Sequence, residues 1–318
     1  GERVISLDGS LFSKPMLSLH RVTQNLVVSL VPVGYGCLGS CAYCCVVFAR
    51  GSLRSYPLEE IVEKIRCDLT TDTKEFWLTS QDMACYGKDL GTNLSTLIKS
   101  VCAVNGDFRV RVGMMTPNFA LDMLNELVEA FRSMKVFKFL HLPVQSGDDT
   151  VLKRMRRCYT IQDFKKVVAA FREAFPELTL ATDVICGFPG ETEEAFENTL
   201  SLISEVKPDI VNVSKFFSRP GTAAAEMPNV VEQAEIKRRS TEVAKLAKQI
   251  SFERNRRWEE WTGGILIDEK GKVPGSWIGR NFAYKPVTVK SIYHLLGKTL
   301  QVRVVKAFST YLEGMIIE

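Results

Sequence analysis

Residues 26 to 45 read LVVSLVPVGYGCLGSCAYCC, a β-branched apolar run that leads directly into a loop rich in glycine and cysteine. The loop places Cys37, Cys41 and Cys44 in a C-x₃-C-x₂-C pattern. Three thiolates on one short loop can bind three irons of a [4Fe–4S] cluster and leave the fourth iron open to chelate a substrate. We interpret the adjacent Cys45 as a buried bystander, because neighbouring cysteines seldom both face one metal.

Other interpretations of the same loop remain open. Gly34, Gly36 and Gly39 spell the G-x-G-x-x-G of a dinucleotide-binding turn. Such a turn opens directly into a helix, however, and no helical pattern begins here before Pro57. The C-x₂-C pair is also typical of a thioredoxin-type redox site, and four cysteines within nine residues could bind zinc. The spacing favours iron and sulfur over these alternatives.

The cysteine usage predicts a reducing compartment. Five of the nine cysteines are scattered singly outside the loop, mostly within apolar stretches: Cys67, Cys85, Cys102, Cys158 and Cys186. That pattern is typical of reduced thiols and not of a disulfide framework. No apolar run reaches about 18 residues and no signal-peptide pattern opens the chain, so we expect a cytoplasmic protein without a membrane segment.

Short β-branched runs alternate with amphipathic stretches from residue 26 onward. We expect strands at Leu26–Val33, Glu75–Thr79, Arg109–Thr116, Val136–Val144, Leu178–Cys186 and Asp209–Phe217. We expect helices at Leu58–Leu69, Leu94–Val104, Leu121–Phe131, Ile161–Phe175 and Thr192–Val206, the last capped by Thr192. Alternation of this kind forms parallel βα units. Six units are too few for a closed eight-unit barrel, so the sequence predicts an open, partial (β/α)₆ barrel with its chemistry at the carboxyl ends of the strands.

The C-terminal part has a different pattern. A polar helix is expected at about Val231–Trp261, followed by short strands at Gly263–Ile267, Pro286–Val289, Thr299–Val304 and Leu312–Ile317, which is typical of a small all-β barrel. Residues 231–318 carry 16 Lys/Arg against 10 Asp/Glu, whereas residues 1–230 carry 25 against 27. The excess is either an ordinary solvated helix face or a surface for a polyanion.

Distinctive motifs follow the predicted strands. They are WLTSQD at Trp77–Asp82, LPVQSG at Leu142–Gly147, TDVICGFPGE at Thr182–Glu191 and RPGT at Arg219–Thr222. Together with the cysteine loop, they resemble the radical S-adenosylmethionine (SAM) methylthiotransferases. Within these, the chain is most similar to the archaeal and eukaryotic type that acts on N6-threonylcarbamoyladenosine in tRNA. The C-terminal module resembles the RNA-binding TRAM domain.

The resemblance implies a reaction and a domain organisation. The open iron of the cluster would bind SAM, and an electron from an external donor would cleave SAM to a 5′-deoxyadenosyl radical. The product would carry a methylthio group at C2 of the modified adenosine next to the anticodon. The implied partners are the tRNA anticodon loop and the electron donor, with no membrane and a monomeric protein. The implied domains are a leader or remnant at 1–21, a radical SAM core at 22–254 and a TRAM domain at 255–318.

One feature of the resembled family has no counterpart in the chain. Family members carry an N-terminal domain with three cysteines that bind a second [4Fe–4S] cluster for sulfur insertion. Here none of the 36 residues before Cys37 is cysteine, and the chain begins with Gly1. We expect the natural protein to be longer, although natural absence of the domain is the alternative. We therefore expect the present chain alone to support only SAM cleavage.

The resemblance also implies roles for individual residues. Cys37, Cys41 and Cys44 would ligate the cluster, and Tyr43 would pack near the adenine of SAM unless it is ordinary core packing. The expected contacts to SAM or to the substrate come from Ser80, Gln81, Asp82, Gln145, Ser146 and Asp183. The buried carboxylate of Asp183 needs a partner, for which the SAM ribose and Lys215 are both candidates. We expect His141 to be a hydrogen-bonded barrel residue.

Basic residues supply the expected contacts to RNA. They are Arg156, Arg157, Arg254, Arg256, Arg257, Arg280, Lys285 and Lys290. Phosphate contacts of this kind position an RNA without specifying its sequence. The target adenine would be splayed out of its loop to reach the barrel. Two other functions stay open: thiomethylation of a protein side chain, and RNA binding by a protein whose metal loop is structural and inert.

Overall fold

The computed structural model describes Leu17 and residues 25–317. Apart from Leu17, the predicted leader or remnant at residues 1–21 lies outside the described part. No helix among the described residues is both long enough and apolar enough to cross a membrane.

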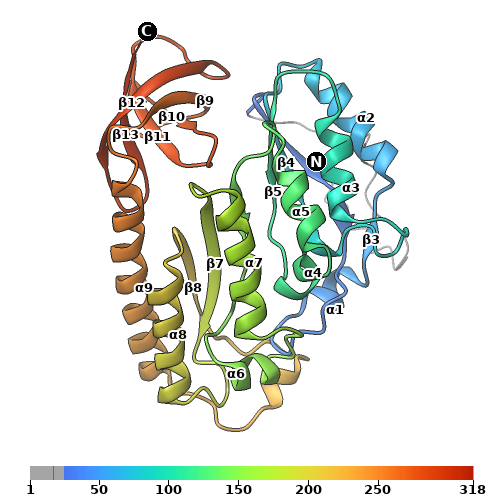
Figure 1. Ribbon diagram of the computed structural model, residues 1–318. Helices are drawn as coiled ribbons and strands as arrows, with labels where there is room; N and C mark the ends of the chain where they lie inside the picture. The colour runs from blue at the N-terminus through green and yellow to red at the C-terminus, as the bar shows by residue number, and fades with distance from the viewer. Residues whose placement is uncertain (1–16, 18–24, 318) are drawn as a thin grey trace, which may run out of the picture.

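Six parallel strands form the larger part of the molecule (Figure 1). They are β1 (Val28–Pro32), β4 (Glu75–Thr79), β5 (Arg109–Val112), β6 (Phe139–His141), β7 (Thr179–Cys186) and β8 (Ile210–Lys215). β1, β4 and β5 pair in that order, as do β6, β7 and β8, and a bridge between Val110 and Val136 joins the two sheets. Among the described strands, β1 and β8 do not pair with each other. The predicted open, partial (β/α)₆ barrel is confirmed.

Amphipathic helices cover the outer face of the strands (Figure 1). They are α2 (Leu58–Leu69), α3 (Leu94–Cys102), α4 (Pro117–Asp122), α5 (Leu124–Phe131), α7 (Ile161–Ala174) and α8 (Glu193–Val206). Their apolar faces bury Ile61, Leu97 and Phe171 in one core with the strand residues Phe76 and Leu140. The Thr192 side chain caps α8 by accepting from the backbone of Ala195, as predicted.

Two helix predictions need correction. The stretch predicted as one helix at Leu121–Phe131 is two, α4 and α5, because the backbone of Met123 leaves the helical region at φ −125°. A five-residue helix, α1 (Val46–Arg50), begins directly after the cysteine loop, although no helix was expected before Pro57. A helix this short has no periodicity to recognise, and its stability comes from its surroundings. The remaining short elements are α6 (Asp149–Arg154), η1 (Met83–Cys85) and η2 (Ala223–Glu226).

The long helix α9 (Gln233–Arg256) runs beside β8 and leads into a closed five-stranded barrel (Figure 1). Its strands are β9 (Thr262–Lys270), β10 (Ser276–Arg280), β11 (Pro286–Lys290), β12 (Thr299–Ala307) and β13 (Leu312–Ile316). The sequence predicted four of these strands and missed β10, which is short, contains Gly279 and changes register against β9 at that residue. Closure leaves no unpaired edge in this small barrel.

The small barrel packs against the amino ends of the parallel strands. Lys138, just before β6, donates its backbone N–H to the carbonyl of Phe282 at 2.8 Å. Lys285 Nζ reaches Asp209 Oδ1, just before β8, at 2.8 Å. The cysteine loop follows the carboxyl end of β1. The two features with expected functions therefore lie at opposite ends of the open barrel.

Candidate iron–sulfur and SAM site

Backbone contacts on both sides fix the cysteine loop. β2 (Gly34–Tyr35) pairs with β3 (Arg54–Ser55), which closes the loop at its base. Gly36 has φ +76°, and a Cβ there would lie 2.1 Å from the carbonyl oxygen of Ser52, so only glycine fits this turn. Farther along, Ala42 donates its N–H to the carbonyl of Met155 at 2.9 Å. The loop is thus held by β3 on one side and by the end of α6 on the other.

Each of the three predicted ligand sulfurs accepts a hydrogen bond. Cys37 Sγ accepts from the N–H of Gly39 at 3.2 Å and Cys44 Sγ from that of Val46 at 3.5 Å. Cys41 Sγ accepts from Arg157 Nη1 at 3.1 Å. Burial raises the pKa of the Cys37 and Cys44 thiols, while the backbone N–H groups act in the opposite direction. Donors directed at sulfur suit thiolate ligands, so the loop fits the cluster that a radical SAM site requires.

The zinc interpretation stays an open alternative. A zinc ion gathers its sulfur ligands at about 2.3 Å, whereas the ligands of a cluster bind different irons and lie farther apart. Within residues 25–317, no group of three His, Cys, Asp or Glu side chains is arranged to hold one metal ion. Cys45 is half-buried, and its Sγ lies 3.7 Å from Arg219 Nη1. Its interpretation as a bystander stays a prediction.

Two unpartnered polar atoms follow β4, the neighbour of β1. Ser80 Oγ and Gln81 Oε1 are buried and have no hydrogen-bond partner among the described residues. Buried polar atoms are nearly always paired in native proteins, and an unpaired one costs free energy. A polar ligand at the carboxyl end of β4 would satisfy both atoms. This observation fits the predicted contacts to SAM.

Asp82 is different, because the fold already uses its carboxylate. It accepts from the backbone N–H of Ala84 at 3.0 Å and from that of Thr116 at 3.1 Å, and also from the Thr116 hydroxyl. These bonds cap η1 and tie the end of β4 to the end of β5. The structure therefore gives Asp82 a structural role, and its contact to SAM stays a prediction.

The carboxylate of Asp183 lies in the barrel with two partners. Asp183 Oδ1 is 2.8 Å from His141 Nε2 and accepts from Asn212 Nδ2 at 2.7 Å. Burial raises the pKa of Asp183, but the hydrogen bonds from His141 and Asn212 outweigh it, so the net shift is downward. His141 is a hydrogen-bonded barrel residue, as predicted. Lys215 is exposed and does not pair with Asp183 among the described residues, while the ribose contact stays a prediction.

Three further predicted SAM or substrate contacts are buried or half-buried. Gln145 adopts φ +69°, and its N–H donates to the carbonyl of Asp183 at 2.8 Å. Ser146 is fully buried, and its Oγ accepts from the N–H of Asp148 at 3.3 Å. Tyr43 packs edge-to-face on Phe188 with the ring centroids 6.4 Å apart, which is core packing. Contacts of these three residues to SAM or to the substrate stay predictions.

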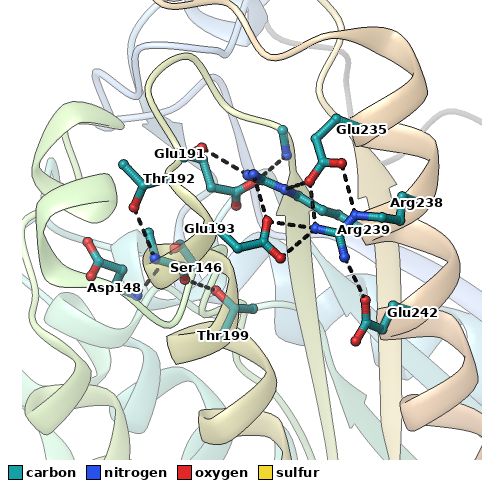
Figure 2. A network of polar contacts seen from close by, with 12 residues as sticks. Ser146, Asp148, Glu191, Thr192, Glu193, Thr199, Glu235, Arg238, Arg239 and Glu242 are labelled. Atoms are coloured by element: carbon teal, nitrogen blue, oxygen red, sulfur yellow. Dashed lines mark hydrogen bonds and ion pairs between the residues drawn. The ribbon is translucent and has the colours of Figure 1, made fainter.

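An ion-pair network joins the turn after β7 to the start of α9 (Figure 2). Glu191 Oε2 accepts from Arg239 Nη1 at 2.9 Å and from the N–H of Gly187 at 2.7 Å. Arg239 also reaches Glu235 at 2.7 Å and Glu193 at 3.2 Å. Because Glu191 and Arg239 are both almost fully buried, the network holds the glycine-rich turn in one position. The sequence analysis missed this pair, since its partners are 48 residues apart.

Four of the predicted RNA contacts are engaged inside the protein. Arg254 and Lys285 both pair with Asp209, at 3.1 and 2.8 Å. Arg280 pairs with Asp268 at 3.0 Å, and Arg157 donates to Cys41. Lys285 is only 3% exposed. The sequence does not reveal these internal partners, and contacts of the four residues to RNA stay predictions. The exposed candidates are Arg156, Arg256, Arg257 and Lys290.

A cavity of about 920 Å³ lies where the small barrel meets the strands. Arg111, His141 and Tyr284 are among the residues that line it. Arg111 stacks over the rings of Trp77 and Tyr284, 5.0 and 5.3 Å from their centroids. No residue of the cysteine loop belongs to its wall. The cavity reaches His141 and Asn212, the two partners of Asp183, but not the cysteine loop.

Comparison with known proteins agrees with this geometry. The family model of the radical SAM superfamily matches residues 31–203, more than half of the chain. A Pyrococcus horikoshii protein named "Probable threonylcarbamoyladenosine tRNA methylthiotransferase" is 43% identical, with 100% of this chain and 74% of the relative covered. The chain belongs to the threonylcarbamoyladenosine tRNA methylthiotransferases of the radical SAM superfamily.

More distant relatives of this radical SAM family extend the comparison. The Homo sapiens threonylcarbamoyladenosine tRNA methylthiotransferase is 35% identical, with 94% of this chain and 51% of that protein covered. Among solved structures, the radical SAM enzyme coproporphyrinogen III oxidase from Escherichia coli has a TM-score of 0.52 at 14% identity. The match spans 92% of this chain and 72% of the oxidase chain. At that identity the likeness supports the fold alone.

Proposed function

We propose that the chain acts in adding a methylthio group to C2 of N6-threonylcarbamoyladenosine next to the anticodon of tRNA. One observation carries the proposal most directly: a loop with three hydrogen-bonded cysteine sulfurs lies beside the unpartnered Ser80 Oγ and Gln81 Oε1. The names of the relatives support tRNA as the substrate class. They favour tRNA over a protein side chain.

Residues of the chain would bind and orient the reacting groups. Cys37, Cys41 and Cys44 would hold the cluster, and Ser80 and Gln81 would contact SAM. When bound, the cluster and SAM together supply one-electron cleavage of SAM. The lowered pKa of Asp183 keeps it ionised at neutral pH, so its carboxylate can accept a hydroxyl hydrogen bond. His141 and Asn212 hold that carboxylate in place. Gln145 and Ser146 are buried close by and would contact the ribose or the substrate base.

The small barrel is proposed to be the TRAM domain, with a boundary near residue 255 and the radical SAM core at 22–254. Its closed five-stranded topology supports this assignment. The exposed Arg256, Arg257 and Lys290 are proposed to contact tRNA phosphates, and the exposed Arg156 would do so near the cysteine loop. Because the small barrel lies opposite the cysteine loop, RNA held there would reach the site along the open side between β1 and β8.

The proposal includes a second [4Fe–4S] cluster for sulfur insertion. The nine cysteines contain no second closely spaced triplet, so its ligands would come from outside these 318 residues. We further propose an external electron donor, a monomeric protein and a cytoplasmic location, where tRNA is available.

Mass spectrometry of tRNA nucleosides tests the proposed function. A strain that lacks the gene should lose the 2-methylthio derivative and accumulate N6-threonylcarbamoyladenosine. The wild-type gene should restore the derivative, and a gene carrying Cys41→Ala should not. An unchanged nucleoside profile in the deletion strain would contradict the proposal. A thiomethylated protein lost in the same strain would favour the protein side chain instead.

A further inference from the structure

Arg157 donates a charged hydrogen bond to Cys41, one of the predicted cluster ligands. Its Nη1 lies 3.1 Å from Cys41 Sγ. Its Nε donates to Tyr159 Oη at 3.0 Å, and the guanidinium lies 5.0 Å from the centroid of that ring. Tyr159 is buried, and its hydroxyl donates to the carbonyl of Val144 at 2.9 Å. The tyrosine therefore holds the guanidinium in a fixed orientation.

The backbone around Arg157 is tied to the cysteine loop as well. Arg157 follows the end of α6, and its N–H donates to the carbonyl of Leu152 at 2.9 Å. Arg156 takes the left-handed conformation, at φ +57°, that ends this turn. The carbonyl of Met155 accepts from the N–H of Ala42, the residue after Cys41. The side chain and the backbone thus fix the guanidinium against the sulfur together.

Arg157 forms no ion pair within 4.0 Å with a carboxylate among the residues that the structure describes, although its charge contributes to lowering the pKa of Asp183. The ion pairs there join other cations, such as Arg239 with Glu191 and Arg254 with Asp209. A half-buried guanidinium without a counter-ion is costly unless another negative group faces it. The guanidinium donates to Cys41 Sγ, which as a cluster ligand would be a thiolate. The pairing is therefore between a fixed positive charge and a cluster ligand.

We propose that Arg157 sets the reduction potential of the cluster. Hydrogen bonds to ligand sulfurs are among the features that tune iron–sulfur potentials. Reduction adds negative charge to the cluster and its thiolates, so a fixed cation at Cys41 Sγ stabilises the reduced form more than the oxidised form. Arg157 thereby raises the potential and makes electron transfer from the donor easier. The inference rests on the cluster in the proposed function.

The test is a potentiometric titration of the reconstituted full chain, followed by electron paramagnetic resonance. Arg157→Gln removes the charge, while Arg156→Gln alters the exposed neighbouring arginine and serves as the matched control. Arg157→Gln should keep its iron and lower the equilibrium constant for reduction about tenfold, which for one electron is about 59 mV. Arg157→Lys should move the reduction potential back toward that of the wild type. The reduction potential of Arg156→Gln should equal that of the wild type.

Each outcome decides between two roles. A loaded Arg157→Gln variant with an unchanged potential would overturn the inference, as would an equal shift in Arg156→Gln. Loss of iron from both Arg157→Gln and Arg157→Lys, with iron retained in Arg156→Gln, would make Arg157 a structural clamp only. A wild-type chain that binds no reducible cluster would instead contradict the proposed function. The failure of the inference is thus separate from the failure of the function.

Discussion

Two polar residues at the end of β4, Ser80 and Asp82, differ in whether the fold uses their side chains. Ser80 Oγ has no partner in the described protein, whereas the carboxylate of Asp82, two residues later, serves two backbone N–H groups and a hydroxyl. Both are polar residues at the same strand end. Only the hydrogen-bond pattern shows which of them lacks a partner in the described protein.

Ser80→Ala should weaken SAM binding by about two- to tenfold, the loss of one hydrogen bond to a ligand. It should leave thermal stability within about 0.5 kcal/mol, because the hydroxyl has no protein partner to lose. Asp82→Ala, the matched control, should lower stability more strongly, since Ala84 and Thr116 would lose their acceptor. Calorimetric titration with SAM and thermal unfolding measure the two effects. A large loss of stability in Ser80→Ala would contradict the assignment.

At the scale of elements, the helix α9 forms ion pairs at both the carboxyl and the amino ends of the parallel strands. Its first turns pair Arg239 with Glu191 in the turn after β7. At its last turns, Arg254 binds Asp209 before β8, and Lys285 of the small barrel completes the cluster. Burial raises the pKa of Asp209, but the two cations outweigh burial and lower it overall. This buried group fixes the small barrel to the amino ends of the strands.

Asp209→Asn should lower the free energy of unfolding by about 3–5 kcal/mol, because it leaves two cations without a buried counter-ion. Glu205→Gln is the control, since it removes only the exposed pair with Lys165, which is worth less than about 1 kcal/mol. Denaturant unfolding measures both variants. Equally small changes in the free energy of unfolding in both variants would show that the ion pairs of Asp209 contribute little to the contact between the small barrel and the parallel strands.

The same group predicts a dependence on pH. A carboxyl whose folded-state pKa is lowered contributes stability above its unfolded value, about 3.9, and loses it as the pH falls through the folded-state pKa. The wild type should therefore lose stability below about pH 4 more steeply than Asp209→Asn. Denaturant midpoints measured between neutral and acidic pH check this. Identical slopes for the two proteins would contradict the charged state of Asp209.

At the scale of the whole molecule, the cysteine loop and the small barrel lie at opposite ends of the parallel strands. Four of the eight basic residues expected to bind RNA are engaged internally, which leaves Arg156, Arg256, Arg257 and Lys290 exposed. The positive surface near the small barrel is therefore smaller than the net charge of its sequence suggests. It is still the surface proposed for RNA phosphates.

Arg257→Gln and Lys290→Gln should each weaken tRNA binding and reduce the slope of log affinity against log salt by about one. Arg109→Gln, on the radical SAM core and bonded to the carbonyl of Met134, is the control and should leave the slope unchanged. Filter binding at several salt concentrations gives the slopes. Slopes that stay equal in all three variants would move RNA recognition away from the small barrel.

The sequence predicted the parts whose signals are local. The strand and helix periodicities gave the six parallel strands and the Thr192 cap, and the spacing of the cysteines gave the loop. Prediction from the sequence failed where the environment of a residue depends on a partner that is distant along the chain. Lys285 reads as a surface cation until the fold brings Asp209 to it across 76 positions, and Arg157 meets Cys41 across 116. Charge alone does not reveal burial.

The most direct test of the account is the formation of 5′-deoxyadenosine by the anaerobically reconstituted chain with SAM and dithionite. The account predicts brown protein with about four irons per chain and release of 5′-deoxyadenosine. Cys37→Ala, Cys41→Ala and Cys44→Ala should each lose the iron and the product, while Cys45→Ala should keep both. Wild-type protein that holds a full cluster but forms no 5′-deoxyadenosine would contradict the radical SAM assignment of this site. Loss of iron in Cys45→Ala but not in Cys44→Ala would contradict the ligand set.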